Sequence, residues 1–365
     1  QMATYIPRVS FPHHYNGEFK NVPLLILLPP QGADRYFYFN HGLKKLADEM
    51  ISTGEIEPML ITCISNDRVF GGYFYAGDSY GAGLYDSLIG DALIEYMYNA
   101  YEPMLLKDSP IQGISGVGMG AYGAFRAALI HPGVFTSVSG VDGPLDFDGG
   151  EGYGNGLIDL MDTVFTKEQT GLNAGNFTST FDSSLIYPVS RLFIGGSIAF
   201  SPHDTLVTVD VIKRRDVNTG LEYNTITIED SSRYTLEDTA TLITHIISED
   251  AYNFDFHLPF NYTERPYDSI WVQYWLPNNL ENLLTNSNGL NNVDIWIGTS
   301  QDAWRGYHNQ TMSWLNTLQN DPSISEPTSY EYTGYSGNPA TNQQYVYDLL
   351  REILVFHSNS FFPDE

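Results

Sequence analysis

One short stretch has the residue pattern of a catalytic turn, but the residue at its centre has no side chain that could react. The sequence Gly116-Val117-Gly118-Met119-Gly120 lies between an apolar segment and a segment with helical periodicity. Many hydrolytic enzymes hold a serine at the centre of such a Gly-x-Ser-x-Gly turn, because the glycines permit a sharp bend and the helix N-terminus favours negative charge. Here the centre is Gly118, and a glycine cannot attack a carbonyl or form an acyl-enzyme.

The turn must be positioned by a strand before it and a helix after it, and the chain supplies both. Apolar segments alternate with helical ones, which is typical of a mainly parallel sheet covered on both faces. The segments that we expect to form strands are 22–28, 59–64, 111–115, 135–141, 192–200, 293–297 and 329–332. The segments that we expect to form helices are 41–50, 85–101, 121–130 and 343–357. The pattern predicts a single doubly wound α/β domain over residues 1–365.

Two segments interrupt this alternation. Residues 149–156 are rich in glycine and are expected to form a loop. Residues 205–230 alternate in the manner of β-strands around Asn218-Thr219-Gly220, which is a hairpin signal. We therefore expect a β-hairpin insertion over residues 205–250. Such a ribbon could serve for self-association, since exposed strand edges can pair with another chain.

The sequence from Gly116 to Phe135 resembles the esterase family of α/β-hydrolases that includes feruloyl-esterase-like and mycolyltransferase-like proteins. That family carries Gly-Leu-Ser-Met-Gly-Gly-Tyr-Gly-Ala, then a helix that ends in His-Pro and a phenylalanine. This chain has the same order with Gly118 in place of the serine. Segments 54–59, 70–75 and 295–302 are also similar, so the likeness extends over about two-thirds of the chain. It implies an α/β-hydrolase fold, with helices on both faces of a mostly parallel sheet.

The resemblance also implies positions for the other catalytic groups. Asp302 matches the acid, and the backbone amide of Met119 matches one donor of the oxyanion hole. The family places its histidine in a Tyr-x-Gly-x-His sequence, and Ser336 stands at that place. The family's first strand ends in His-Gly, whereas this one ends in Pro29 and Pro30, and a proline has no N–H to donate. The amide of Gln31 or Gly32 is the alternative donor.

Without the serine and the histidine, the Ser-His-Asp route of hydrolysis is lost. We therefore expect a pseudoenzyme that uses the esterase scaffold for binding or assembly. The alternative is an active carboxylesterase of the feruloyl- or acetyl-esterase type in which Gly118 replaces the native serine; it would need a base such as His308. Ser115 and Ser139 are substitute nucleophiles in principle, but both fall within expected strands.

A second alternative uses the same glycines. Gly118, Gly120 and Gly123 also fit the Gly-x-Gly-x-x-Gly pattern of a dinucleotide-binding turn. Asp142 follows at about the 20-residue distance at which such a site places the carboxylate for the ribose. A tightly packed turn between strand and helix explains the glycines without any ligand.

Four carboxylates lie close together in the sequence after the strand expected at 135–141. Asp142, Asp146, Asp148 and Glu151 are separated mainly by glycines and apolar residues. Oxygen ligands on a flexible backbone suit Ca²⁺, although the spacing is not that of an EF-hand. A solvated acidic loop without a metal is the other interpretation, and no other cofactor is expected.

Four aromatic residues could line a cleft for a carbohydrate or aryl ligand, or could pack in the core: Trp271, Tyr274, Trp275 and Trp304. The lone cysteine, Cys63, lies in an apolar segment and is expected to be a buried thiol.

Composition restricts the partners of the protein. With 44 acidic and 17 basic residues, the formal charge is −27, which repels nucleic acid and anionic membranes. No run of about 18 apolar residues is present, so no membrane span is expected. Abundant tyrosine and glycine with few lysines favour an extracellular or cell-surface location.

Overall fold

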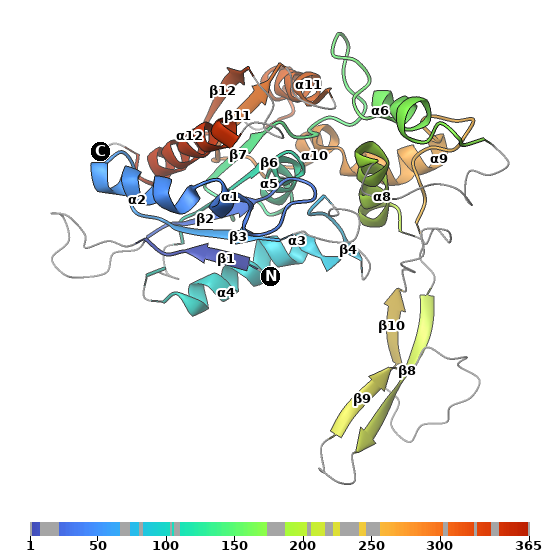
Figure 1. Cartoon of the computed structure of the whole chain (residues 1–365), viewed down its shortest axis with the longest axis horizontal. Coiled ribbons are helices and arrows are strands. Elements are labelled where there is room, and N and C mark those ends of the chain that lie inside the picture. Colours follow the sequence, from blue (N-terminus) through green and yellow to red (C-terminus); the bar gives the residue numbers. More distant parts are fainter. Residues whose placement is uncertain are drawn as a thin grey trace.

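The computed structural model is built around a seven-stranded sheet of order β1-β3-β2-β6-β7-β11-β12 (Figure 1). The strands are β1 Met2–Tyr5, β2 Leu24–Leu28, β3 Leu60–Ile64, β6 Gln112–Val117, β7 Ser137–Val141, β11 Asp294–Ser300 and β12 Ser329–Tyr335. All neighbours pair in parallel except β1 and β3, which are antiparallel. The structure describes residues 2–7, 22–65, 74–79, 83–102, 104–105, 110–173, 187–202, 206–215, 222–226, 241–245, 256–301, 306–324, 327–336 and 343–363.

Helices cover both faces of this sheet, because its central strands are apolar on both sides. In β2, Leu24, Ile26 and Leu28 belong to one core, and Leu25 and Leu27 belong to the other. The first core is covered by α4 Leu93–Ala100, α5 Met119–Ile130, α8 Pro188–Phe200, α10 Leu280–Asn286 and α11 Tyr307–Asn320. The second is covered by α1 Phe37–Asn40, α2 Leu43–Thr53 and α12 Gln343–Phe361. The predicted doubly wound arrangement is therefore confirmed.

Short elements complete the described part of the chain. They are β4 Asp78–Ser79, β5 Gly83–Leu84, α3 Tyr85–Ser87, η1 Leu88–Ala92, α6 Ile158–Thr163, η2 Val164–Glu168, α9 Asp268–Ile270, η4 Trp271–Trp275 and η5 Leu276–Asn278. Cys63 in β3 is fully buried, as its apolar neighbours predicted.

One strand prediction is wrong. The apolar segment 192–200 is not a strand but the greater part of helix α8, Pro188–Phe200. Every residue from Leu192 to Phe200 is buried, so the helix has no polar face whose spacing could reveal it. Pro188 occupies the first turn, where a helix tolerates the missing N–H.

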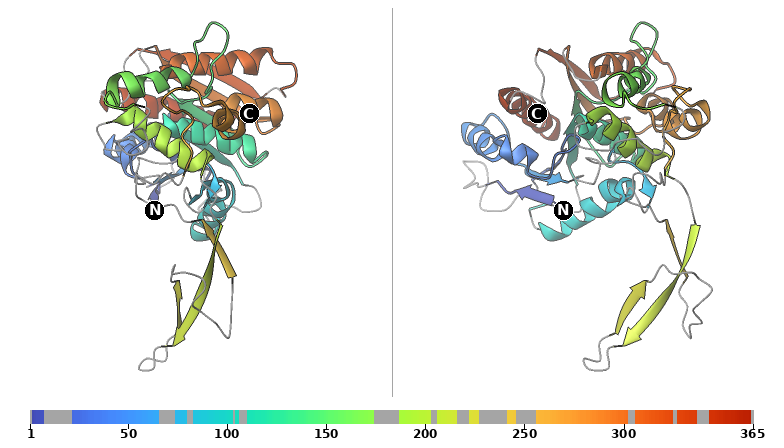
Figure 2. Two further views of the ribbon diagram at one scale, coloured as in Figure 1. Left: turned by 90° about the vertical axis from the view of Figure 1, so that its right-hand side faces the viewer. Right: turned by 45° about the vertical axis from the view of Figure 1, so that its right-hand side comes forward.

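A second, three-stranded sheet projects away from the main sheet (Figures 1 and 2). Its strands are β8 Leu206–Arg215, β9 Glu222–Ile226 and β10 Thr241–His245. Both β9 and β10 pair antiparallel with β8, which lies between them. We call these three strands the arm. The expected turn at Asn218-Thr219-Gly220 lies outside the described residues.

A buried ion pair fixes α5 against the segments beside it. The Arg126 guanidinium donates from Nε and Nη2 to the two carboxylate oxygens of Asp86 in α3, at 2.9 and 2.8 Å. Its Nη1 donates to Oδ1 of Asn278, at the end of η5, at 2.9 Å. Arg126 is 8% exposed, so water contributes little to the solvation of this charge. The orientation of α5 therefore depends on this ion pair, because removing either partner would leave the other charge without its counter-charge.

We expect Arg126→Met to destabilise the protein by about 3–5 kcal/mol, because it leaves the Asp86 carboxylate without its cation. Urea unfolding followed by tryptophan fluorescence measures the change. The matched control is Arg351→Met, which removes the exposed pair with Glu55 and should change stability by less than about 1 kcal/mol. Equal effects of the two substitutions would contradict this role for the buried pair.

Candidate functional site

Gly118 lies at the apex of the turn that joins β6 to α5. It has φ 59° and ψ −120°, a conformation that strains any residue with a Cβ. Its N–H donates to the carbonyl of Val141 at 2.8 Å, and its own carbonyl accepts from the amide of Ala121 at 3.0 Å. Gly118 is partly exposed, whereas Val117 and Met119 on either side are buried. The tip of the turn is therefore its accessible point.

The flanking glycines are required by close backbone packing. A Cβ on Gly116 would lie 2.1 Å from the carbonyl carbon of Gly120, and a Cβ on Gly120 would lie 1.9 Å from the carbonyl oxygen of Leu28. A Cβ on Gly118 would meet nothing nearer than Cβ of Pro30, at 3.5 Å. Of these three positions, the central one alone has room for a side chain.

We expect Gly120→Ala to lower the free energy of unfolding by at least about 3 kcal/mol, since the new methyl group overlaps a backbone carbonyl that cannot move freely. Gly171→Ala is the control, because a Cβ there meets no atom within 4 Å. That variant should stay within about 1 kcal/mol of the wild type. Urea denaturation of both variants checks the prediction, and a tolerated Gly120→Ala would refute it.

On one side, the β6–α5 turn packs against the end of β7. Asp142 follows this strand with φ 49°, and its Oδ1 accepts from the amide of Ser300 at 2.7 Å and from Oγ1 of Thr299 at 3.2 Å. The carboxylate therefore joins β7 to β11 inside the protein. Gly123 is explained by packing too, since a Cβ there would lie 2.6 Å from Cβ of Tyr75. These contacts do not favour the dinucleotide alternative.

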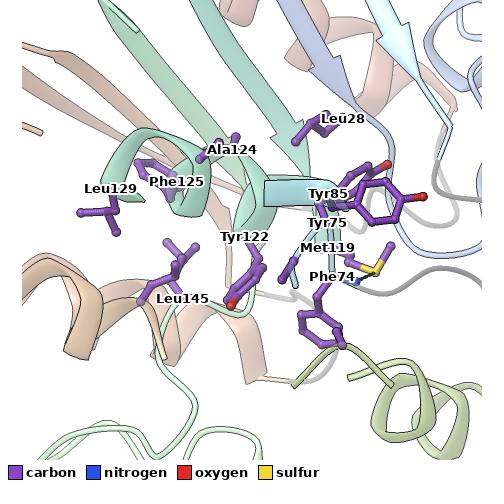
Figure 3. Close-up of a cluster of buried hydrophobic side chains, with 14 of the residues drawn as sticks. Leu28, Phe74, Tyr75, Tyr85, Met119, Tyr122, Ala124, Phe125, Leu129 and Leu145 are labelled. Carbon is purple, nitrogen blue, oxygen red and sulfur yellow. Dashed lines mark hydrogen bonds between the residues drawn. The ribbon is translucent and has the colours of Figure 1, made fainter. Parts of the chain in front are cut away.

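On its other side, the β6–α5 turn packs against the end of β2. Figure 3 shows Met119 beside Phe74 and Tyr75, and its sulfur accepts a hydrogen bond from the amide of Phe74 at 3.3 Å. The hydroxyl of Tyr75 donates to the carbonyl of Pro29 at 2.9 Å. As the first residue of α5, Met119 has an amide that cannot bond within its own helix. This is the amide that the resemblance assigns to the oxyanion hole.

The other predicted catalytic positions lie beyond the ends of β11 and β12. Ser336 directly follows β12, the edge strand, and is exposed. The amide of Gln301 donates to the carbonyl of Tyr335 at 3.3 Å, so the two strand ends remain paired up to this point. Asp302 lies outside the described residues, and its assignment stays a prediction. His308 is half-buried in the first turn of α11.

A buried network of serines and one histidine lies within the sheet, and sequence reasoning missed it. Nδ1 of His357, on α12, is 2.7 Å from Oγ of Ser137, and Nε2 is 2.9 Å from Oγ of Ser139. Ser139 donates onward to Oγ of Ser115 at 2.7 Å. All four residues are 0% exposed. Of the two candidate substitute nucleophiles, Ser139 therefore contacts the imidazole and Ser115 contacts only Ser139, and both are buried beyond the reach of a substrate.

The network fixes the state of the imidazole. Ser139 has one proton and gives it to Ser115, so it accepts from Nε2–H, and Nδ1 accepts from Ser137. Burial lowers the pKa of His357 to about 3, because the apolar surroundings disfavour the charged ring. Both nitrogens are occupied by hydroxyl groups. This histidine is a neutral packing residue.

The same burial predicts a pH dependence of stability. Between about pH 6.5 and pH 3 the unfolded chain binds a proton at His357 that the folded chain does not, so acid destabilises the fold. We expect the wild type to lose about 2 kcal/mol more than His357→Gln between about pH 7 and pH 5. Urea unfolding of both proteins at the two pH values measures this difference. Parallel losses in the two proteins would exclude a titrating His357 as the cause.

The structure brings together two of the four carboxylates that sequence analysis assigned to a metal. Asp146 and Asp148 lie near Glu281 of α10, and oxygens of the three are within 4.8 Å of one another. Asp142 is engaged at the end of β11, and Glu151 is exposed, so neither belongs to this group. Glu281 was missed because nothing in the local sequence connects it with a loop more than 130 residues earlier.

The predicted aromatic cleft is largely core. Trp271 and Trp275 are buried and stack with ring centres 5.7 Å apart. Tyr274 packs partly buried against the same core, and Trp304 lies outside the described residues. Among the described helices, none is both long and apolar enough to cross a membrane.

Comparison with solved structures finds esterases at low sequence identity. A ferulic acid esterase is 12% identical with a TM-score of 0.50, over 94% of this chain and 87% of that one. An S-formylglutathione hydrolase from Agrobacterium tumefaciens is 10% identical with a TM-score of 0.49, over 99% and 89%. The enzyme of the same name (FrmB) from Staphylococcus aureus is 12% identical with a TM-score of 0.49, over 98% and 92%.

No protein-family model matches the sequence, and no curated protein matches it. At identities this low, structural likeness carries information on the fold and not on the reaction. The resemblance around Gly118 and the sheet topology lead to the same architecture. The chain has the α/β-hydrolase fold of the esterase-like enzymes.

Proposed function

We propose that the protein is a catalytically inactive member of the esterase-like α/β-hydrolases that serves in binding or assembly. The observation that carries this proposal is Gly118, which occupies the partly exposed apex of the strand–turn–helix at a positive φ, where a Cβ would meet nothing nearer than 3.5 Å. A serine at this point of the turn would be the attacking group, and the chain supplies only a hydrogen atom there.

The remaining groups support the same conclusion. Ser336 holds the place of the histidine and has a hydroxyl that cannot act as a base near neutral pH. His357, the histidine that does contact serines, is enclosed between α12 and the sheet and stays neutral. At the positions that the resemblance assigns, hydrolysis through an acyl-enzyme therefore lacks both its nucleophile, at Gly118, and its base, at Ser336.

We expect the wild-type protein to hydrolyse p-nitrophenyl acetate no faster than buffer. Gly118→Ser alone should remain inactive, because Ser336, at the family's histidine position, has no imidazole that could activate the new hydroxyl. The double variant Gly118→Ser with Ser336→His should hydrolyse the ester faster than the wild type and faster than Gly118→Ser, if Asp302 stands where the resemblance assigns it. Initial rates at equal folded concentration measure the difference, and turnover by the wild type or by Gly118→Ser alone would refute the proposal.

Gly118→Ala is the matched control for this series. It introduces the same Cβ and the same strain at positive φ, expected at about 1–3 kcal/mol, without a hydroxyl. Because a Cβ at this position has free space, all three variants should fold, as circular dichroism can check. Any gain in rate that Gly118→Ala shares does not come from a nucleophile at 118.

For the assembly role we propose the arm as the contact, on a protein outside the cell. Among the described strands, β9 and β10 each pair with β8 alone, and we assign the opposite edge of each to pairing with another chain. The arm also projects away from the main sheet, where a second chain could approach (Figure 2). The acidic, tyrosine-rich composition supports an extracellular or cell-surface location.

Replacing residues 204–250 by a short Gly-Ser linker should convert an oligomer into a monomer without unfolding the main domain. Light scattering coupled to gel filtration measures the mass of both proteins. A wild-type chain that is monomeric at every concentration tested would contradict the assembly role. A deletion variant that still forms the same oligomer as the wild type would contradict it as well.

A further inference from the structure

Three carboxylates converge between the loop after β7 and the start of α10. Asp146 and Asp148 belong to the loop, and Glu281 lies in the first turn of α10. One oxygen from each lies within 4.8 Å of the others. Two oxygens bound to the same Ca²⁺ are each 2.3–2.6 Å from it, so they can be up to about 5 Å apart. The three groups could therefore reach one ion without rearrangement of the backbone.

Neutral donors hold the carboxylates in place but do not balance their charge. The Asn279 side-chain amide donates to Oδ1 of Asp146 at 3.1 Å and to Oδ1 of Asp148 at 2.7 Å. Oγ1 of Thr317 donates to Oε1 of Glu281 at 2.5 Å. The ion pairs between described residues join other groups: Arg126 with Asp86, Arg265 with Asp162, and Arg351 with Glu55.

The buried oxygen of Asp146 supplies independent evidence for a ligand. Asp146 is 0% exposed, and no described donor reaches its Oδ2. A buried carboxylate oxygen without water or a donor is energetically unfavourable, so a protein seldom leaves one unsatisfied.

We propose that Asp146, Asp148 and Glu281 bind one Ca²⁺ ion. The donors are all oxygens, which excludes the nitrogen and sulfur sets that zinc prefers. Three protein carboxylates at one site favour Ca²⁺ over Mg²⁺, because Mg²⁺ is usually held by one or two carboxylates and keeps several waters. The ion would join the loop after β7 to α10. That loop begins at Asp142, whose carbonyl lies 3.9 Å from the Cβ position of Gly118.

Calcium titrated calorimetrically into the full-length chain, after treatment with EDTA and dialysis, tests the site. We expect one ion per chain with a dissociation constant of about 1 mM or lower. Glu281→Gln and Asp148→Asn should each weaken binding at least about tenfold, because a carboxylate ligand becomes a neutral amide. The matched control is Glu151→Gln, which removes an equal charge from an exposed position in the same loop and should bind as the wild type does.

Thermal unfolding supplies a second readout that does not depend on the titration. Without calcium, Glu281→Gln should melt at or above the wild-type temperature, because one of three repelling carboxylates is gone. In millimolar CaCl₂ the order should reverse, since the wild type gains the ion. NaCl at equal ionic strength controls for screening of the overall charge of −27. The proposal would be overturned if calcium binding did not saturate, or if Glu151→Gln lost as much calcium affinity as Glu281→Gln. It would also be overturned if NaCl changed the melting temperatures as much as CaCl₂ does.

Discussion

The contact between the β6–α5 turn and the end of β2 determines how the centre of this molecule is built. The Cβ position of Gly120 falls 1.9 Å from the carbonyl oxygen of Leu28, so two backbone segments touch where side chains would normally separate them. That approach forces the chain through positive φ at Gly118 and starts α5 at Met119. The helix is then held in this orientation by the buried pair of Arg126 and Asp86. The turn at Gly118 is thus held by packing on both sides.

This arrangement separates the requirements of folding from those of catalysis. Gly116 and Gly120 cannot change because the backbone occupies their side-chain space, whereas Gly118 and the exposed Ser336 have few neighbours to disturb. A serine at 118 and a histidine at 336 would add chemistry without adding to the core. Their absence leaves the sheet, both hydrophobic cores and the turn intact. The α/β-hydrolase fold therefore does not require a serine at 118 or a histidine at 336.

Local sequence patterns predicted the parts of the structure that depend on neighbouring residues. The periods of apolar residues located most strands and helices, and the glycine spacing located the turn around Gly118. Segment 192–200 was mistaken for a strand because a helix buried on all sides shows no helical alternation of apolar and polar residues. The Ser-His network and the association of Glu281 with Asp146 were missed for another reason. They join residues far apart in the chain, and only the folded topology brings those residues together.

The distance in sequence across the buried network has a consequence for folding during translation. His357 bonds to Ser137 and Ser139, which are made 220 and 218 residues earlier. At 5–20 residues per second, a ribosome takes roughly ten to forty seconds to cover that distance. Until α12 arrives, its face of the sheet is covered by α1 and α2 alone, and the polar groups on β7 lack the helix that bonds to them. The nascent chain therefore presents an open sheet surface for that interval, which is the kind of surface that molecular chaperones bind.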